Sequence, residues 1–273
     1  MLLFLILISS IAISIVAYLV AYLVSSRPKK VLFTMTTFFD FPKEDKWAAF
    51  CNAMDSVLSF HPGIVGIANF IVVNEYSPNG ENWSKRVREK YPFVKFIQKT
   101  SESRGQCKSL NMILSMIGEY VYWIHWEEAW FATRRFLFDA VEIMERTNIS
   151  QLQFTKDHGV THWHDKINIC YSLENSHYCI ISQQVSTDST LPNLNRTYTH
   201  EDWMNVQWPL YSIRPSINRV SDYDFGPFSE DPDLWPLKFE IEFGHRWMKN
   251  GNVKAIFADG PVTRKGSHVS TYH

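Results

Sequence analysis

Runs of apolar residues alternate with segments of helical periodicity along the first half of the chain. Four apolar runs have the length of a strand and end in polar or turn residues: 31–38, 67–76, 94–100 and 119–126. Three segments between them carry large apolar residues every three or four positions, as on one face of a helix: 45–60, 83–91 and 106–118. Continuous apolar strands that alternate with helices predict an α/β fold with a mainly parallel sheet covered on both faces.

Polar residues follow these predicted strands where each strand ends. They are Thr36, Glu75, the turn 101–105, Glu127 and Glu128. Parallel strands present their carboxyl ends at one edge of a sheet, and ligands of α/β proteins bind beyond that edge. We therefore expect a ligand site there. Strand ends are also polar simply because they meet water, and periodicity alone leaves this alternative open.

The first 24 residues carry no charged side chain and precede SSRPKK, residues 25–30. Roughly 20 apolar residues suffice to cross the hydrocarbon core of a membrane, so we expect 1–24 to be a single transmembrane anchor in the lipid bilayer and 25–30 a basic linker. A cleaved signal peptide is the alternative, but its apolar region is normally about 7 to 15 residues long. The basic linker favours a cytosolic catalytic part, whereas sequons at Asn82, Asn148 and Asn195 suit the lumen. The orientation stays open.

Composition narrows the classes of partner. The chain has 273 residues, is 45% hydrophobic and has a formal net charge of -1. A protein that binds nucleic acid through a basic surface needs clustered lysines and arginines, so we expect no nucleic-acid partner. The cysteines allow at most two disulfides and do not identify the compartment: Cys51, Cys107, Cys170 and Cys179.

Two adjacent glutamates, Glu127 and Glu128, end the fourth apolar run between Trp126 and Trp130. Burial of an ionised carboxylate costs free energy unless a partner compensates its charge. We therefore expect this pair either at an exposed strand tip or bound to a cation.

The order and spacing of five segments resemble those of the family 2 type glycosyltransferases of GT-A fold. The segments are IVVNEYS, RGQCKSLNMIL, YVYWIHWEEAWF, FEIEFGHRWMKNG and GSHVS. The resemblance covers about residues 31–270. It implies a glycosyltransferase domain over 31–273, with a nucleotide-sugar-binding half at 31–130 and an acceptor-side half at 131–273.

The resemblance implies roles for particular residues. The nucleotide sugar would contact Thr36, Glu75, Arg104, Gly105, Lys108 and Asn111. Thr36 and Glu75 would hold the base and the ribose, and Arg104 with Lys108 would approach the diphosphate. Basic residues on exposed loops are often only solvated, which is the alternative for these last two.

The leaving diphosphate needs its developing charge neutralised. A divalent cation held by carboxylates does this without a proton, and Mn2+ or Mg2+ suits oxygen ligands. The resemblance implies a metal site formed by Glu127, Glu128 and His268. Two departures from the family pattern would weaken or shift this site, because His125 replaces a common aspartate and Ala129 stands where the nearest variant often has a third acid.

The acceptor hydroxyl must lose its proton as it attacks, and a carboxylate within about 3 Å is the usual base. The resemblance implies that Glu240 is this catalytic residue and that the anomeric carbon is inverted. A salt bridge from Glu240 to Arg246 is the structural alternative. Glu242 would be the base if the register differs by one turn.

Three hypotheses of function follow. The first is a membrane-anchored, metal-dependent glycosyltransferase that moves a sugar from a nucleotide sugar, UDP-linked by our expectation, to a glycan or another hydroxyl acceptor. The second is a catalytically silent relative that binds glycan or nucleotide sugar as an anchored scaffold, suggested by His125 and Ala129. The third is a zinc hydrolase, because the spacing of residues 158–165 suits metal ligands: His158, His162, His164 and Asp165.

Overall fold

The computed structural model describes most of the chain after residue 29. The described residues are 30–39, 44–77, 80–155, 167–173, 176–181, 211–231 and 238–264. The predicted anchor, the histidines of 158–165 and His268 lie outside them. No helix within these ranges is long and apolar enough to cross a membrane. The anchor at 1–24 therefore stays a prediction.

Strands and helices alternate through the first half of the chain, as the apolar pattern predicts. The described strands are β1 (Val31–Thr37), β2 (Ala68–Asn74), β3 (Val94–Gln98), β4 (Tyr122–Glu127), β5 (Trp130–Ala132), β6 (Gln151–Gln153), β7 (Ile167–Leu173), β8 (Ser176–Ile181), β9 (Ser216–Arg219), β10 (Lys254–Phe257) and β11 (Val262–Arg264). The described α-helices are α2 (Glu44–Phe60), α3 (Ile64–Ile67), α4 (Gly80–Lys90), α5 (Gln106–Leu114), α6 (Leu137–Arg146) and α8 (Lys238–Lys249). Short 3-10 turns are η1 (Ile117–Glu119) and η3 (Val220–Tyr223). The predicted elements are present, with ends shifted by a few residues.

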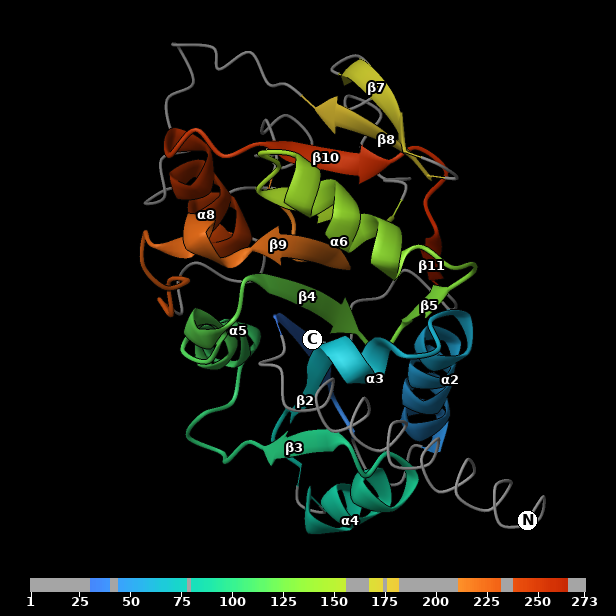
Figure 1. The fold of residues 1–273 in the computed structure, drawn as a ribbon. Coiled ribbons are helices and arrows are strands. Elements are labelled where there is room, and N and C mark those ends of the chain that lie inside the picture. The colour runs from blue at the N-terminus through green and yellow to red at the C-terminus, as the bar shows by residue number, and fades with distance from the viewer. Residues whose placement is uncertain are drawn as a thin grey trace, which may run out of the picture.

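The described strands form one large sheet in the order β3-β2-β1-β4-β9-β6-β10-β8-β7, with β11 and β5 as a separate pair (Figure 1). The first four strands in this order are parallel, as expected from their continuous apolar runs. Beyond β4 the sheet becomes mixed because β9 runs antiparallel to both β4 and β6. The chain thus has a mixed α/β fold whose predicted parallel part is confirmed.

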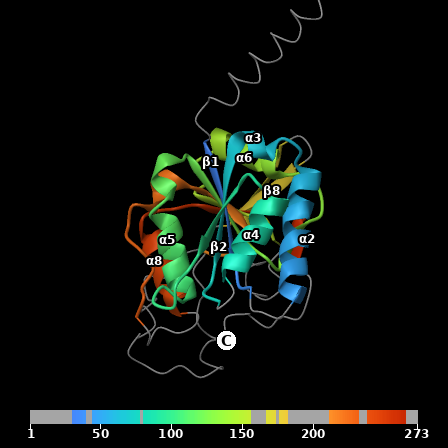
Figure 2. The same cartoon turned by 90° about the horizontal axis from the view of Figure 1, so that it is seen from below.

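Helices cover both faces of the sheet, with α5 and α8 on one side and α2, α4 and α6 on the other (Figure 2). Every residue of β1 is buried because this strand lies between the two layers. The larger core contains aromatic side chains such as Phe33, Trp126 and Phe154, and the core under α8 is built around Phe243 and Trp247. These two cores hold β4 and α8 in fixed positions, which matters because each carries a candidate site residue.

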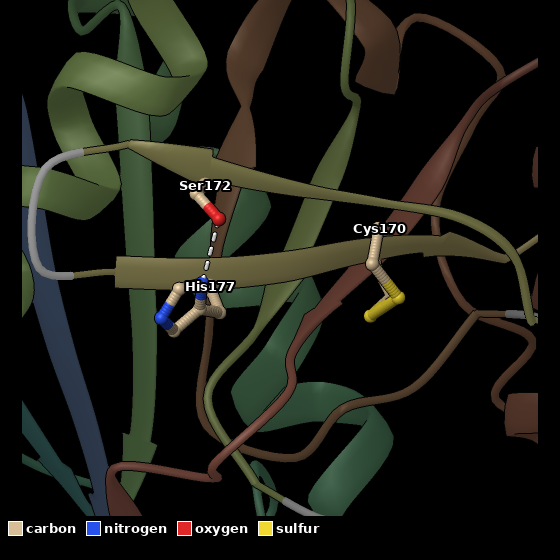
Figure 3. The surroundings of a disulfide bond; sticks show 4 residues. Cys170, Ser172 and His177 are labelled. Carbon is tan, nitrogen blue, oxygen red and sulfur yellow. Dashed lines mark hydrogen bonds between the residues drawn. A yellow bond between two sulfur atoms is a disulfide. The ribbon is translucent and has the colours of Figure 1, made fainter.

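The hairpin of β7 and β8 forms the far edge of the sheet (Figures 1 and 3). Its register places Cys170 opposite Cys179, and a disulfide joins them. Cys51 and Cys107 are free thiols. One of the two disulfides that the sequence allows is therefore formed, and it lies away from the carboxyl ends of β1 and β4.

Candidate functional site

The carboxyl ends of the parallel strands bring together the polar residues of the first half. In the register of the sheet, Thr36 of β1 lies beside Glu127 of β4, and Thr37 lies beside Asn74 of β2. Glu75 follows directly, and its backbone N–H donates to the Thr37 carbonyl over 2.9 Å. The predicted gathering of polar residues at one edge is confirmed.

The Glu75 carboxylate is buried and fully hydrogen-bonded. Its Oε1 atom accepts from Lys99 Nζ at 2.7 Å and from Ser109 Oγ, and its Oε2 atom accepts from the backbone N–H of Gly105 at 3.0 Å. Lys99 also donates to the Gly105 carbonyl at 2.8 Å. Burial lowers the pKa of Lys99, and the hydrogen bond and charge of Glu75 oppose this shift. The ion pair therefore ties the end of β2 to the turn that precedes α5.

A set of side-chain amides fixes the same edge. Asn74 Oδ1 accepts from Thr37 Oγ1 and from the backbone N–H of Phe39, both at 2.9 Å. Asn74 Nδ2 donates to Gln98 Oε1 at 2.8 Å. Gln98 Nε2 in turn donates to the Glu75 carbonyl at 2.9 Å. Each of β1, β2 and β3 is thus linked to its neighbour at the carboxyl end, which makes this part of the edge rigid.

Most of the other predicted nucleotide-binding residues surround this edge. Thr36 Oγ1 is buried and has no hydrogen-bond partner among the described residues. Arg104 and Gly105 are exposed in the turn before α5. Gly105 has φ of 120°, a conformation that side-chain-bearing residues rarely adopt. Lys108 Nζ donates to the Glu102 carbonyl at 2.6 Å, so it folds back over the turn.

Asn111 makes its contacts at a different place. Its Nδ2 atom donates to the Phe228 carbonyl at 3.0 Å and to Glu230 Oε1 at 2.8 Å, and its Oδ1 atom accepts from the Phe228 N–H at 2.8 Å. The amide therefore holds the segment before α8 against α5. Its predicted contact with the nucleotide stays a prediction.

The two adjacent glutamates lie in different surroundings, because Glu127 is the last residue of β4 and Glu128 begins the turn that leads to β5. Glu127 Oε2 accepts from Trp130 Nε1 at 3.0 Å. Glu128 is only 4% exposed, and its Oε1 atom lies 3.7 Å from Lys46 Nζ. Burial raises the pKa of Glu128 to about 7, and the Lys46 charge opposes that shift. Glu128 is thus buried near Lys46 rather than exposed at a strand tip, and its role as a metal ligand stays a prediction.

Glu127 suits a divalent cation better than Glu128. Its side chain is partly exposed, and its Oε1 atom accepts no hydrogen bond within the described ranges, whereas Glu128 already faces Lys46. One or two carboxylates, together with phosphates and waters, commonly hold Mg2+. No three His, Cys, Asp or Glu side chains form a ready group of metal ligands in the described part of the chain. A metal here would therefore need further ligands, supplied by the nucleotide or by residues outside the described ranges, such as the predicted ligand His268.

His125, the first of the two expected departures from the family pattern that the sequence resembles, is a core residue of β4. Its exposed fraction is 1%, and its Nδ1 atom lies 3.4 Å from Thr34 Oγ1. Burial lowers the pKa of His125 to about 3, so the ring is neutral at physiological pH. One residue, Trp126, separates His125 from Glu127, so both side chains project to the same side of β4.

Glu240 is a buried carboxylate on α8 that lies within electrostatic reach of Glu127. It is 6% exposed, and its Oε1 atom accepts from the backbone N–H of Ile213 at 3.0 Å. Burial raises the pKa of Glu240 to about 7, and the negative charge of Glu127 adds to this shift. The fold therefore brings together two carboxylates that are far apart in sequence and that both hold protons more tightly than usual.

Arg246 pairs with Glu242 rather than with Glu240. Its Nε and Nη2 atoms lie 2.6 Å and 2.9 Å from the two Glu242 oxygens, one helical turn away. Arg246 also donates to the carbonyls of Phe225 and Pro227. The expected alternative of a salt bridge from Glu240 to Arg246 is not formed. Since Glu242 is committed to this ion pair, Glu240 is the better placed of the two candidate bases.

Sequence reasoning missed two basic residues at this edge. Lys99 neutralises Glu75, and its place directly after an apolar run is a signal that could have found it. The charge of Arg214 acts on Glu127 and on Glu240 and opposes the rise of pKa that burial causes in each. No sequence signal marks Arg214, because the strand it precedes is short and its partner strands lie far away in the sequence.

Comparison with known proteins identifies the fold. The sequence matches no protein-family profile and no curated protein. Its structure is similar to that of S. aureus TarS in complex with UDP-GlcNAc, with a TM-score of 0.54, 16% identity and coverage of 89% of this chain and 61% of the other. For the TarS complex with UDP the values are 0.53, 16%, 84% and 58%.

A third similar structure is the mannosyltransferase PcManGT from Pyrobaculum calidifontis in complex with GDP-Man and Mn2+. The TM-score is 0.51 and the identity 12%, with coverage of 86% of this chain and 59% of that chain. The chain thus spans about three fifths of the length of each of these proteins. Likeness at such low identity establishes architecture, and the chain has a GT-A-like glycosyltransferase fold.

Proposed function

We propose that the chain is a glycosyltransferase that moves a sugar from a nucleotide sugar to a hydroxyl of a glycan or another acceptor. One observation carries this proposal: the partly exposed Glu127 and the buried Glu240 lie within electrostatic reach of each other, and burial raises the pKa of both carboxyl groups. Ionisable groups with strongly shifted pKa values cluster at functional sites. The similar structures contain UDP, UDP-GlcNAc or GDP-Man, which supports a nucleotide-sugar donor, and we expect a UDP-sugar.

The donor would bind over the ends of β1 and β2. Thr36 Oγ1 offers a buried hydroxyl without a partner in the described structure, and Arg104 and Lys108 supply positive charge at the start of α5. Glu75 is the predicted contact of the nucleotide base. Because Lys99, Ser109 and Gly105 use both Glu75 oxygens, that contact would share its acceptor atoms with these bonds.

A divalent cation, Mn2+ or Mg2+, would supply charge neutralisation for the leaving diphosphate. Glu127 is the ligand we propose from the geometry, and Glu128 and His268 are the further ligands implied by the family resemblance. Glu128 would have to exchange its contact with Lys46 to take part. Glu127 needs no such exchange, because its Oε1 atom has no partner in the described ranges.

Glu240 would act as the general base. The Ile213 N–H holds one of its oxygens, and the other can accept the proton of the acceptor hydroxyl. A base is most effective when its pKa lies near the working pH, and the pKa of Glu240 is raised to about 7. A single displacement assisted by this base would invert the configuration at the anomeric carbon.

We also propose that residues 1–24 anchor the enzyme to a membrane through one span. The support is the sequence itself, which has 24 consecutive residues without a charged side chain before the basic linker 25–30. Fusion of a glycosylation reporter after residue 30 would test both the span and the side of the membrane that the enzyme faces.

A screen of nucleotide sugars for Mn2+-dependent hydrolysis tests the proposed function. We expect one donor to be cleaved by the wild type and calorimetry to show binding of the corresponding nucleoside diphosphate with Mn2+. Glu127→Gln should weaken the Mn2+ dependence of binding, whereas Glu119→Gln, at an exposed position of η1, should not. Binding of the nucleotide without hydrolysis or transfer would favour the catalytically silent alternative.

A further inference from the structure

Arg214 lies directly before β9, next to the end of β4. The antiparallel register of these strands pairs Ser216 with His125. This is the last pair of the register, and Arg214 and Glu127 each lie two residues beyond it. The Pro215 carbonyl accepts from the Phe154 N–H at 2.9 Å, so β9 keeps its pairing with β6 past the strand end. Arg214 and Glu127 therefore leave the same end of the β4–β9 pair, where the Arg214 charge acts on Glu127.

The backbone around Arg214 is also fixed on the side of α8. The neighbouring Ile213 N–H donates to Glu240 Oε1 at 3.0 Å. The N–H of Arg214 itself donates to Ser212 Oγ at 3.2 Å. The backbone at Arg214 is therefore fixed next to Glu240.

Electrostatic effects also place the Arg214 charge near Glu127 and Glu240. Burial raises the pKa of both Glu127 and Glu240, and the Arg214 charge opposes the rise in each. Arg264 acts in the same sense on Glu127, and Lys254 does so on Glu240. Arg214 is the cation whose field reaches both carboxylates.

We propose that Arg214 is a catalytic residue that contacts the diphosphate of the donor. The inference rests on the proposed function: a diphosphate brought to Glu127 through a cation would enter the region where the Arg214 charge already acts on Glu127. A guanidinium can donate two parallel hydrogen bonds to phosphate oxygens, which a lysine cannot. Because arginine stays protonated in proteins, its charge is present throughout the reaction.

The chemical step requires such a charge. The bond from the anomeric carbon to the diphosphate oxygen breaks, and its electron pair stays on the diphosphate. The acceptor oxygen forms the new bond to that carbon, and its proton passes to Glu240. Arg214 stabilises the added negative charge on the diphosphate through hydrogen bonds and takes up no proton.

Calorimetric titrations with UDP and with uridine, in the presence of Mn2+, test this contact on the full chain. Arg214→Gln should weaken UDP binding by about 10- to 100-fold, as expected for loss of hydrogen bonds to a charged group, and leave uridine binding unchanged. The UDP affinity of Arg214→Lys should lie between those of the wild type and Arg214→Gln, because lysine keeps the positive charge but lacks the paired N–H donors of a guanidinium. Arg88→Gln, at an exposed position of α4, should bind both ligands as the wild type does.

Three results would overturn the inference. Equal UDP affinity of Arg214→Gln and the wild type would show that Arg214 does not contact the diphosphate. Equal losses of UDP and uridine affinity would show that it only shapes the pocket. A wild type that binds neither UDP nor GDP would contradict this inference and the proposed function together. If the wild type binds GDP but not UDP, the affinities of wild type and Arg214→Gln for GDP and guanosine decide the inference by the same criteria.

Discussion

Two buried carboxylates at the same edge of the sheet differ in the number of hydrogen bonds and charged partners that they have. At the ends of β2 and β3, Glu75 is paired with Lys99 and accepts from three donors. Between β4 and α8, Glu240 accepts one hydrogen bond from the backbone, and burial raises its pKa to about 7. The two residues have the same chemistry and nearly the same burial, so their surroundings make the difference.

The number of partners distinguishes a carboxylate that stabilises the fold, such as Glu75, from one that can exchange a proton, such as Glu240. A carboxylate whose hydrogen-bonding capacity is filled contributes rigidity, because moving it breaks several bonds at once. A carboxylate that is buried with few partners is costly to ionise, and it can take up a proton near neutral pH. This contrast supports a scaffolding role for the Glu75 cluster and the proposed role of Glu240 as general base.

Removal of the Lys99 charge should have the largest effect on stability. Lys99→Met leaves Glu75 buried without its cation and should lower the free energy of unfolding by about 3–5 kcal/mol, as measured by urea denaturation. Lys85→Met is the matched control, because the ion pair of Lys85 with Glu89 is exposed and such pairs contribute about 0.5 kcal/mol or less. Similar losses for the two variants would contradict the scaffolding role of Lys99.

Removal of the Asn111 amide should have an intermediate effect. Asn111→Ala leaves the buried backbone of Phe228 without its two partners and should cost about 1–3 kcal/mol. Hydrogen exchange should speed up in residues 225–231, since the amide holds them against α5. Asn69→Ala removes an exposed hydrogen bond to Tyr120 and should change neither quantity. Unchanged exchange in 225–231 would show that Asn111 does not hold this segment.

Of the three predicted effects on stability, the pH dependence caused by Glu128 should be the smallest. Burial raises the pKa of Glu128 from 4.5 to about 7, so the folded protein binds this proton more tightly than the unfolded chain. Its contribution to stability is therefore full below pH 4.5 and is lost as the pH rises through 7. Urea denaturation across this window in EDTA should show a smaller loss for Glu128→Gln than for the wild type. A larger loss for the variant would reverse the assigned sign.

The elements of the first half follow from the sequence, and those of the second half do so only in part. Strands β1, β2 and β4 are continuous apolar runs that are almost completely buried, and their pattern is sufficient to place them. The edge strand β3 is only partly buried but follows the same apolar pattern. Strands β6 and β9 are short and carry buried amides, with Gln151 Nε2 donating to Asn218 Oδ1 at 2.8 Å. A polar side chain that is satisfied by a distant strand looks like a surface residue in the sequence, so the insertion of β9 between β4 and β6 was not predicted.

The residues of the candidate site, like the elements of the fold, could be predicted from the sequence only in part. Glu127 and Glu240 were found through the order of family-like segments, and the fold brings them into electrostatic contact. The different surroundings of Glu127 and Glu128 depend on which side of the strand end Lys46 occupies. Arg214 requires the register of β9, and no local pattern encodes a register between strands so far apart.

The central claim is that Glu240 transfers the proton. It is tested most directly by the kcat of sugar transfer, or of donor hydrolysis, for Glu240→Gln beside Glu242→Gln. We predict a loss of about 100- to 10,000-fold in kcat for Glu240→Gln, the range of general base catalysis, with the affinity for the nucleoside diphosphate unchanged. An unaltered kcat in Glu240→Gln, together with a loss of that size in a folded Glu242→Gln, would contradict the account.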